Sequence, residues 1–328
     1  MTRYPRRSFI RLLAATAFGA LALSTAAPAQ AAELKKLEII APANPGGGWD
    51  QTARTIQGLL QEAGLASSVQ VQNVPGAGGT IGLAQFVTTK KGKGDTVLLA
   101  GQTLQGAIIT NKAPVTLDQV TPVARLVGEY EIVVVPVDSP IKTLDDLMAK
   151  VKADPQSVSW GGGSVGSTDH ILAGLMMQAV GADLTKLNYI AHSGGGEALS
   201  SILGGHVTAG ISGYGEFGPQ VDAGKLRALA ISSDERMPGV DIPTLKEQGL
   251  DVSFFNWRGM WAPAGIRNAD LKALSTAVET LLASPAWKEI LTKRQWVDLA
   301  QPAAEFAAFV KDDRTKMEKI LTDLGLAK

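Results

Sequence analysis

Two glycine-rich turns, each placed where a strand gives way to a helix, constrain this chain most. The first turn covers residues 42–50 (PANPGGGWD), and the second covers residues 73–82 (NVPGAGGTIG). Such turns leave several backbone N–H groups without partners, close to the positive end of a helix dipole. A site of this kind binds a carboxylate as readily as a phosphate, and glycines let a ligand approach the backbone closely. The sequence therefore predicts a protein that holds a small anion.

The first 31 residues have the features of a cleaved signal peptide. An apolar run over residues 12–27 is shorter than the roughly 20 residues of a membrane span, and residues 29–31 (AQA) offer a cleavage site near Ala31. The arginine pair resembles a twin-arginine export motif, but Pro5 stands where that motif has Ser or Thr, so the general secretory route remains open. Both routes predict a periplasmic protein. The arginines of the leader are Arg3, Arg6, Arg7 and Arg11.

Length and composition narrow the class of protein further. The chain left after cleavage has about 297 residues, which is long for one hydrophobic core, so two domains are expected. The chain contains no cysteine, which excludes thiol chemistry and disulfides. Without the four leader arginines, acidic residues outnumber basic residues by four. This mildly acidic balance argues against a nucleic-acid partner.

Strands alternate with helices along most of the chain, which predicts an α/β fold with a parallel or mixed sheet. Residues 126–136 are apolar enough to form a central strand of a second sheet, and the pattern from residue 269 to the end predicts helices only. We expect the chain to cross between the two domains near residues 129–131 and 255–257. The strand–glycine-turn–helix unit recurs at residues 42–50, 73–82, 161–168 and 192–196.

Several sequence blocks, in the same order along the chain, carry a resemblance to one family. The chain resembles the extracytoplasmic solute receptors of tripartite tricarboxylate transporters, the TctC or Bug group, over essentially all of the exported part. The blocks are residues 45–50 with Arg54, residues 73–79, residues 163–167 with His170, residues 226–230 with Arg236, residues 243–245 with Glu247 and Gly249, and residues 261–265.

The resemblance implies an α/β, two-domain periplasmic binding fold of the Venus-flytrap, type II-like kind, with a ligand cleft between the domains. The expected domain 1 consists of residues 32–130 plus 256–328, and domain 2 of residues 131–255. The resemblance also implies a monomer that delivers a small carboxylate to a membrane permease with a large and a small subunit. Residues 46–50 (GGGWD) are similar to the tricarboxylate branch, so citrate or a relative is the leading ligand. Residues 192–194 differ from the Tyr-Lys-Gly of many members, which leaves contacts from the fourth turn open.

The residues expected at the site lie in the turns and in the helix starts that follow them. Asp50 and Arg54 are four residues apart on one helix face, so we expect them to pair and order the first turn rather than touch the ligand. The hydroxyls of the third turn can cap a helix or donate to the ligand, and His170 can donate or pack. The predicted ligand-binding residues are Gly47, Gly48, Trp49, Gly76, Ala77, Gly78, Gly79, Thr80, Thr103, Ser164, Gly166, Ser167, Thr168, His170 and Ser193.

Catalysis is the competing class, and the sequence disfavours it. Ser167, Asp169 and His170 are close in sequence, but no Gly-x-Ser-x-Gly elbow surrounds the serine. The three histidines lack metal-ligand spacing, and no Gly-Lys-Ser/Thr follows the glycine turns. We therefore expect a receptor without a metal or a cofactor rather than a hydrolase. A sensor that presents bound ligand to a membrane kinase needs the same closed, liganded form and remains the alternative.

Overall fold

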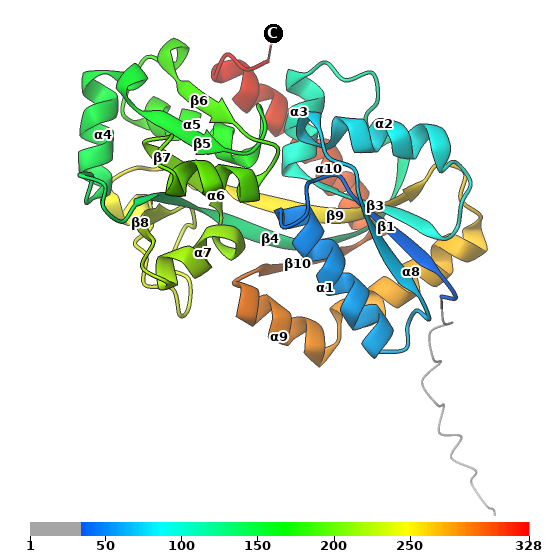
Figure 1. Ribbon diagram of the computed structural model, residues 1–328. Helices are drawn as coiled ribbons and strands as arrows, with labels where there is room; N and C mark the ends of the chain where they lie inside the picture. The colour runs from blue at the N-terminus through cyan, green and yellow to red at the C-terminus, as the bar shows by residue number, and fades with distance from the viewer. Residues whose placement is uncertain (1–33, 328) are drawn as a thin grey trace, which may run out of the picture. The chain divides into compact units, whose positions relative to one another are not determined.

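The computed structural model describes residues 34–327, so the predicted signal peptide and its cleavage site lie outside the described residues. Figure 1 shows how the helices and strands are arranged. The strands are β1 (Leu37–Ala41), β2 (Val69–Asn73), β3 (Thr96–Gly101), β4 (Val120–Pro136), β5 (Ser159–Gly162), β6 (Asn188–Ala191), β7 (Ala209–Gly213), β8 (Leu226–Ile231), β9 (Phe255–Pro263) and β10 (Val297–Pro302). The helices are α1 (Gly48–Glu62), α2 (Thr80–Thr89), α3 (Gln102–Thr110), α4 (Leu144–Ala153), α5 (Thr168–Ala179), α6 (Gly195–Leu203), α7 (Tyr214–Asp222), α8 (Asn268–Leu282), α9 (Pro285–Arg294) and α10 (Ala303–Asp323).

The strands join into one mixed sheet with the order β2-β1-β3-β9-β4-β7-β5-β6, and β8 and β10 each pair with β4. Strands β1, β2 and β3 are parallel at one end, and β5, β6 and β7 are parallel at the other. We call β1, β2, β3, β9 and β10 with their helices the first lobe, and β5 to β8 with their helices the second lobe. This arrangement confirms the predicted α/β fold class.

Strand β4 runs through both lobes. Its first part pairs antiparallel with β9 and β10, and its last part pairs antiparallel with β7 and β8. The change occurs where Glu129 lies opposite Asn256 of β9 and Glu131 lies opposite Gly213 of β7. The strand expected over residues 126–136 is therefore present, but it begins six residues earlier than expected and also pairs in the first lobe. The strand begins at Val120 because β9 supplies a pairing partner that local sequence does not reveal.

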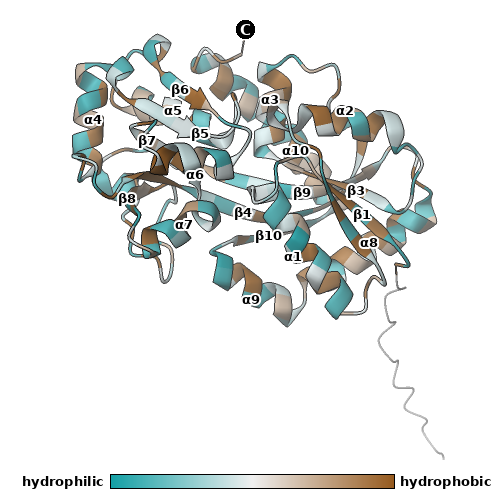
Figure 2. Ribbon diagram, viewed as in Figure 1, coloured by the Kyte–Doolittle hydropathy of each residue, from teal (hydrophilic) through white to brown (hydrophobic). Residues whose placement is uncertain are grey.

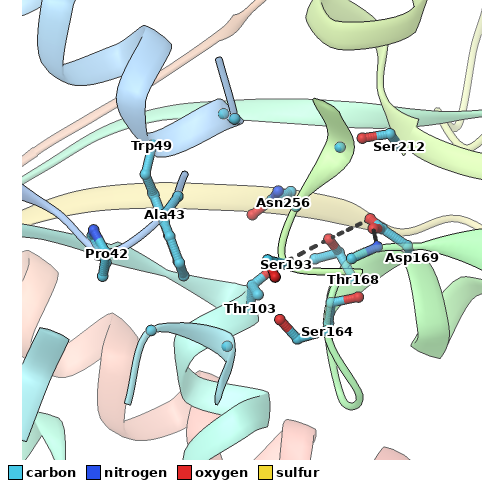
Figure 3. A pocket seen from close by; sticks show the side chains of 18 of the residues that line it. Pro42, Ala43, Trp49, Thr103, Ser164, Thr168, Asp169, Ser193, Ser212 and Asn256 are labelled. Carbon is cyan, nitrogen blue, oxygen red and sulfur yellow. Dashed lines mark hydrogen bonds between the residues drawn. The ribbon is translucent and has the colours of Figure 1, made fainter. Parts of the chain in front are cut away.

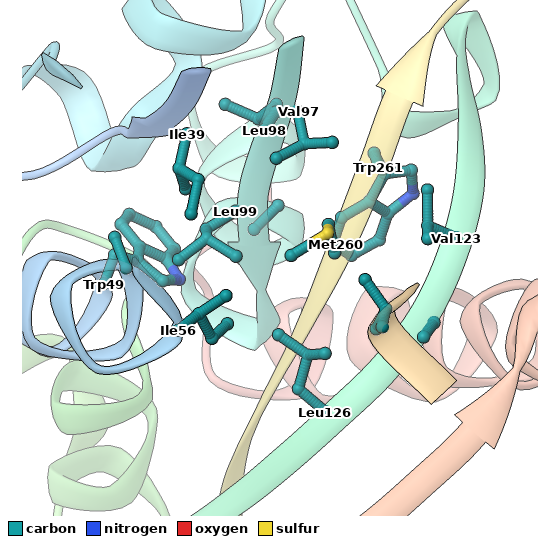
Figure 4. Packing of buried hydrophobic residues seen from close by; sticks show 14 of the residues in the cluster. Ile39, Trp49, Ile56, Val97, Leu98, Leu99, Val123, Leu126, Met260 and Trp261 are labelled. Atoms are coloured by element: carbon teal, nitrogen blue, oxygen red, sulfur yellow. The ribbon is translucent and has the colours of Figure 1, made fainter. Parts of the chain in front are cut away.

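Each lobe has its own hydrophobic core. In the first lobe, α1 places Ile56 against β1 and β3, and Met260 and Trp261 of β9 lie on the other side of β3 (Figure 4). The core of the second lobe contains Trp160 and Leu172, both fully buried. Figure 2 shows that α1 and α2 carry both hydrophobic and hydrophilic residues, as amphipathic helices that cover a sheet do.

Helix α1 shows how local sequence produces this packing. Ala53, Ile56 and Leu60 recur at intervals of three and four residues and are fully buried, so one face of the helix packs on the sheet. The helix begins directly after Gly47 and ends at Ala63, whose N–H donates to the carbonyl of Leu59. The burial of this apolar face, rather than intrinsic helix propensity, accounts for most of its stability.

Helix α10 packs in both cores. Phe306, in its first turn, belongs to the core of the first lobe, whereas Met317 and Leu321 belong to the core of the second lobe. Leu324 follows the helix and packs against Gly174 of α5. One continuous helix therefore connects the two lobes in addition to β4. The domain boundaries expected from the sequence remain a prediction.

The expectation of helices only, from residue 269 to the end, was wrong at one place. Residues Val297–Pro302 form β10, which pairs antiparallel with β4 through Val297 and Gly128 and through Gln301 and Arg125. The side chains of β10 alternate between half-buried and exposed. A six-residue edge strand between two helices carries a weak local signal, because tertiary pairing rather than propensity determines it.

Truncation of Leu321 tests whether α10 holds the second lobe. Leu321 is fully buried, so Leu321→Ala is expected to lower the free energy of unfolding by about 2–5 kcal/mol through lost contacts and a residual cavity. Urea denaturation of both proteins measures the change. Thr322→Ala, at the exposed neighbouring position, is the control and should change stability by less than about 0.5 kcal/mol. A change for Leu321→Ala as small as the control would mean that α10 contributes little to this core.

Candidate functional site

A cavity of about 70 Å³ lies where the strand-to-helix turns of the two lobes meet. Figure 3 shows Ala43 and Trp49 on one side and Thr168, Asp169 and Ser212 on the other. A cavity of about 150 Å³ accommodates benzene, so this one suits a compact ligand. Its lining consists of Pro42, Ala43, Gly47, Gly48, Trp49, Gly76, Gly78, Gly79, Thr103, Gly163, Ser164, Ser167, Thr168, Asp169, Ser193, Gly194, Gly195, Ser212, Glu216, Asn256 and Arg258.

Five helices begin at or beside this cavity with a glycine at the N-cap. Gly47 precedes α1, Gly79 precedes α2, Gly101 precedes α3, Gly194 precedes α6 and Gly213 precedes α7, and none of the five helices has a side-chain cap. The first N–H groups of a helix have no partner within it. Those donors and the positive ends of the helix dipoles therefore make the cavity favourable for an anion.

Asp50 holds the first turn in shape. One of its carboxylate oxygens accepts hydrogen bonds from the N–H of Gly46 (2.9 Å) and from Arg54 Nε (3.0 Å), and the other accepts from Asn73 Nδ2 (2.9 Å). Burial alone would raise the pKa of Asp50, but the hydrogen bonds from Arg54, Gly46 and Asn73 outweigh it and leave the pKa below its ordinary value. The carboxylate is engaged by its own loop and does not line the cavity.

The second turn requires an unusual backbone. Gly76, Ala77, Gly78 and Gly79 all have positive φ angles, between 47° and 124°. The alanine is held in this conformation because its carbonyl accepts hydrogen bonds from Thr80 Oγ1 (2.9 Å) and Asn111 Nδ2 (3.2 Å). Three glycines in the left-handed region leave the N–H groups of the turn free of side-chain cover.

The third turn carries polar side chains into the cavity. Ser167 caps α5, with its hydroxyl accepting from the N–H of His170 (3.4 Å). Asp169 reaches back along the turn, where it accepts hydrogen bonds from the N–H of Gly163 and from Thr168 Oγ1 (3.2 Å). Gly166, at φ 77°, provides the reversal that brings these side chains together.

Contacts between the lobes surround the cavity. Thr103 Oγ1 of α3 lies 3.4 Å from Thr168 Oγ1 of α5. Asn44 Nδ2 of the first turn donates to Glu197 Oε1 of α6 (2.6 Å), and the other oxygen of Glu197 accepts from the N–H of Ser193 (3.0 Å). The structure thus presents the two sets of turns in contact with each other.

A buried ion pair lies beside the first turn. Arg258 of β9 pairs with Glu129 of β4, and both side chains are almost completely buried. Arg258 Nη1 also donates to Thr52 Oγ1 (3.2 Å), and the other oxygen of Glu129 accepts from the N–H of Gly215 (2.7 Å). A Cβ on Gly48 would collide with the guanidinium, so the first turn approaches this cation closely because that residue is glycine.

The second-lobe side of the cavity is acidic. Burial raises the pKa of Asp169 to about 6, against the opposing effect of its hydrogen bonds. Burial and the neighbouring Glu129 raise the pKa of Glu216 to about 7, while Arg258 and the hydroxyl of Ser212 oppose the shift. Glu131 lies behind them, and burial together with Asp169 and Glu129 raises its pKa well above the ordinary value. Burial lowers the pKa of His170 to about 4, so that this imidazole is neutral at pH 7.

Four predicted ligand-binding residues do not line the cavity. Ala77 and Thr80 form the internal hydrogen bond of the second turn. The N–H of Gly166 donates to His170 Nδ1 (3.2 Å), and the imidazole stacks on Tyr189 with ring centroids 4.1 Å apart, so that both residues shape the third turn. The structure brings the others together at the cavity, namely Gly47, Gly48, Trp49, Gly76, Gly78, Gly79, Thr103, Ser164, Ser167, Thr168 and Ser193.

Sequence reasoning missed most of the charged lining. Glu216 follows β7 at the start of α7, in the same strand-to-helix position as the predicted turns, but only one glycine precedes that helix directly. Asn256 and Arg258 belong to β9, where the sequence indicated a crossing between domains and no local motif assigned either side chain to the ligand. The residues of the lining that were not predicted are Pro42, Ala43, Gly163, Asp169, Gly194, Gly195, Ser212, Glu216, Asn256 and Arg258.

The arrangement is suited to binding rather than to catalysis. His170 Nδ1 accepts a hydrogen bond from the N–H of Gly166, and the hydroxyl of Ser167 caps α5, so this nitrogen is not available as a general base for that hydroxyl. Among residues 34–327, no group of three or more His, Cys, Asp and Glu side chains is placed to hold a metal ion. None of the helices in this range is long and apolar enough to cross a membrane.

Comparison with known proteins identifies relatives of the whole chain. The profile of the tripartite tricarboxylate transporter family receptor matches residues 52–326. The protein BugT of Bordetella pertussis is 29% identical over 326 residues, which cover 96% of this chain and 98% of BugT.

Solved structures share the fold. The periplasmic binding protein BugD superposes with a TM-score of 0.80 at 24% identity, covering 90% of this chain and 99% of BugD. MatC from Rhodopseudomonas palustris with bound malate superposes with a TM-score of 0.78 at 24% identity, covering 88% of this chain and 99% of MatC. Together with the two lobes and the cavity between them, these similarities show the predicted Venus-flytrap fold of two-domain periplasmic binding proteins.

Replacement of Asp50 tests its role in the first turn. Asp50→Asn removes the charge that pairs with Arg54. It also places an amide N–H₂ group against the surrounding hydrogen-bond donors, which have no use for another donor. The substitution is therefore expected to lower the free energy of unfolding at pH 7 by about 1–3 kcal/mol. Because the pKa of Asp50 is depressed in the folded protein, its contribution is present above the ordinary value of 3.8 and is lost as the pH falls through the lower folded value.

Urea denaturation at pH 7 and at pH 3.5 measures this effect. The difference between wild type and Asp50→Asn should be largest at pH 7 and smaller at pH 3.5. The exposed Asp312→Asn on α10 is the control and should change little at either pH. Equal stability of wild type and Asp50→Asn at pH 7 would show that the turn does not depend on this carboxylate.

Proposed function

Because this chain belongs to the tripartite tricarboxylate transporter receptor family, a family of binding proteins rather than enzymes, we propose that it is a periplasmic receptor for a small carboxylate. The observation that carries the proposal is the cavity at which uncapped, glycine-initiated helices of both lobes begin. In this proposal the receptor works as a monomer and delivers its ligand to a membrane permease with a large and a small subunit.

The first-lobe turns supply the carboxylate site in this proposal. In this proposal the anion lies against the backbone of Gly48 and Trp49 at the start of α1 and of Gly76 and Gly78 in the second turn, close to Arg258, whose charge is shared with Glu129. The hydroxyls of Thr103 and Ser164 also line the cavity and can donate hydrogen bonds to the carboxylate. Because Asp50 and the backbone of the second turn set these loops before binding, little conformational entropy is lost when the ligand enters.

The volume of the cavity and the acidic side chains that line it limit which carboxylic acids can bind. Malate is the ligand in the MatC structure, and the small volume of the cavity favours short acids over larger ones. Citrate, the leading ligand from the sequence, would place a third ionised carboxylate near Asp169 and Glu216, where like charges repel. Citrate binding therefore requires that these side chains be protonated, as their raised pKa values allow below about pH 6.

A thermal-shift screen tests the proposed function. Purified protein, freed of carried-over ligand, is heated with citrate, tricarballylate, succinate, malate, glutamate and terephthalate, each beside an uncharged amide analogue. Ligand at a hundredfold excess over Kd stabilises the folded form by about 2.7 kcal/mol, which raises the Tm by several degrees. A rise with an acid but not with its amide is the expected result. The absence of a rise with any acid, in protein shown to be folded, would contradict the proposal.

Replacement of Thr103 tests the hydroxyl contribution. Thr103→Val keeps the side-chain shape and removes the hydroxyl at the start of α3, so the affinity for the best acid of the screen should fall by about 0.5–1.5 kcal/mol, or roughly two- to tenfold. Calorimetric titration measures Kd. Thr88→Val, at an exposed position of α2 away from the cavity, is the matched control. Equal Kd values for wild type and Thr103→Val would exclude this hydroxyl from the ligand contacts.

A further inference from the structure

The two sides of the cavity have opposite chemical character. On the first-lobe side, the lining consists mainly of the glycine turns with their backbone N–H groups, together with the hydroxyl of Thr103 and Arg258, whose charge is paired with Glu129. On the second-lobe side, it offers the carboxyl groups of Asp169 and Glu216. In their ionised form, acidic side chains at the wall of the cavity repel the carboxylate of a ligand. These acids therefore require an explanation beyond carboxylate binding.

A third carboxyl group adds to this side. Glu131 of β4 is 0% exposed, and Asp169 and Glu216 both act on its pKa. Within residues 34–327, neither of its oxygens receives a hydrogen bond of normal geometry, although the hydroxyl of Thr168 and the carboxyl group of Asp169 are its neighbours, and Oε1 of Glu216 has no partner either. Unpartnered carboxyl oxygens in a protein interior are costly. We call Glu131, Asp169 and Glu216 the acidic wall.

The groups packed around the acidic wall do not neutralise it. From β9, Arg258 approaches, but Glu129 of β4 already pairs with it. From α5, His170 is neutral at pH 7. From β6, Tyr189 has a pKa well above its ordinary value because of burial and the nearby Asp169, and is also neutral. Two members of the acidic wall, Asp169 and Glu216, therefore line the cavity, while the neighbouring cation, Arg258, is paired with Glu129.

The wall is better matched to an ammonium group than to a metal ion. No set of three or more carboxyl or imidazole groups among the described residues is arranged around a common metal position. An ammonium group needs only two or three acceptors at hydrogen-bond distance, and charge-assisted hydrogen bonds of this kind are strong in a buried site. A carboxylate on the opposite side of the same cavity then completes a zwitterionic ligand.

We propose that the ligand of this receptor carries a protonated amine as well as a carboxylate, with the carboxylate at the first-lobe turns and the amine at the acidic wall formed by Asp169, Glu216 and Glu131. This inference rests on the proposed function and specifies its ligand class as a compact amino acid. In this proposal Asp169 and Glu216 contact the amine, and Glu131 lies behind them, where it interacts with both carboxyl groups.

Binding of an amine and binding of a second carboxylate should change the protonation of the acidic wall in opposite directions. Burial raises the pKa of Asp169 to about 6 and that of Glu216 to about 7, and the pKa of Glu131 is higher than its ordinary value as well, so part of the acidic wall is protonated near neutral pH. An ammonium group favours the ionised carboxylates, so binding an amino acid releases protons. A second carboxylate at the same place favours the protonated carboxyls, so binding an acid without an amine takes up protons. The two ligand classes therefore differ in the sign of the proton exchange.

Calorimetric titration with paired probes tests the inference. The probes are L-alanine with propionate, 4-aminobutyrate with butyrate, and L-aspartate with succinate, so that each pair differs by one amine. In at least one pair, the amine-bearing acid should bind tenfold or more tightly than its partner. Titration in buffers of different ionisation enthalpy should show proton release for that amino acid at pH 7, and its affinity should rise between pH 5.5 and pH 8.

Variants locate the amine. Glu216→Gln should weaken the preferred amino acid by tenfold or more and leave the amine-free partner unchanged or tighter. Asp222→Asn, exposed at the end of the same helix, is the matched control and should change neither. If Glu216→Gln does not fold, Glu131→Gln, which removes an unpartnered buried carboxyl, replaces it and should reduce the proton release on binding.

The possible outcomes separate the two proposals. If amine-free acids bind as tightly as their amine-bearing partners in every pair, or bind with no loss when the pH rises, the amine inference is overturned while the carboxylate receptor stands. If no carboxylic acid binds, with or without an amine, the proposed function fails and the inference fails with it. Competition by Ca²⁺ or Mg²⁺ against the amino acid would assign the acidic wall to a metal instead.

Discussion

The buried pair of Arg258 and Glu129 lies at the point where the architecture changes from one lobe to the other. The pair joins β9 to β4 beside the position at which β4 changes partners. Arg258 also donates a hydrogen bond to Thr52 of α1, and Glu129 accepts one from the N–H of Gly215 in α7. Removing two charges from water is costly, and only good geometry with further hydrogen bonds compensates for it. Because each partner here has such a bond, strands and helices from both lobes are held in register under the cavity.

The position of the cavity follows from this arrangement. Parallel strands on each side of β4 and β9 end in turns that face each other, so the helix starts of both lobes converge on one small volume. The first lobe contributes backbone donors, and the second contributes hydroxyls and carboxyls. Helix α10 packs in both cores, so any opening of the lobes must bend β4 and β9 and shift α10 against one core. A continuous helix limits how independently the lobes can move.

Local sequence predicted the parts of the fold that local physics controls. The glycine turns could be located because left-handed backbone and uncapped helix starts need glycine, as the φ angles of Gly76, Gly78 and Gly79 show. The pair of Asp50 and Arg54 could be anticipated because helical spacing alone brings the two residues together. By contrast, β10 and the first part of β4 were missed, since their hydrogen-bond partners lie far away in the chain. The domain boundaries and the export signal remain predictions.

The chain sequence alone was sufficient for the fold class, the receptor family and most of the neutral lining, because each of these depends on short motifs. The charged character of the site was decided only by the tertiary structure. Glu131, Asp169 and Glu216 come from a strand and two different helices, and nothing in their local sequence brings them together. Strand pairing around β4 places them side by side, and burial then raises their pKa values. Both effects depend on distance through space and on exclusion of water, neither of which is encoded in residue spacing.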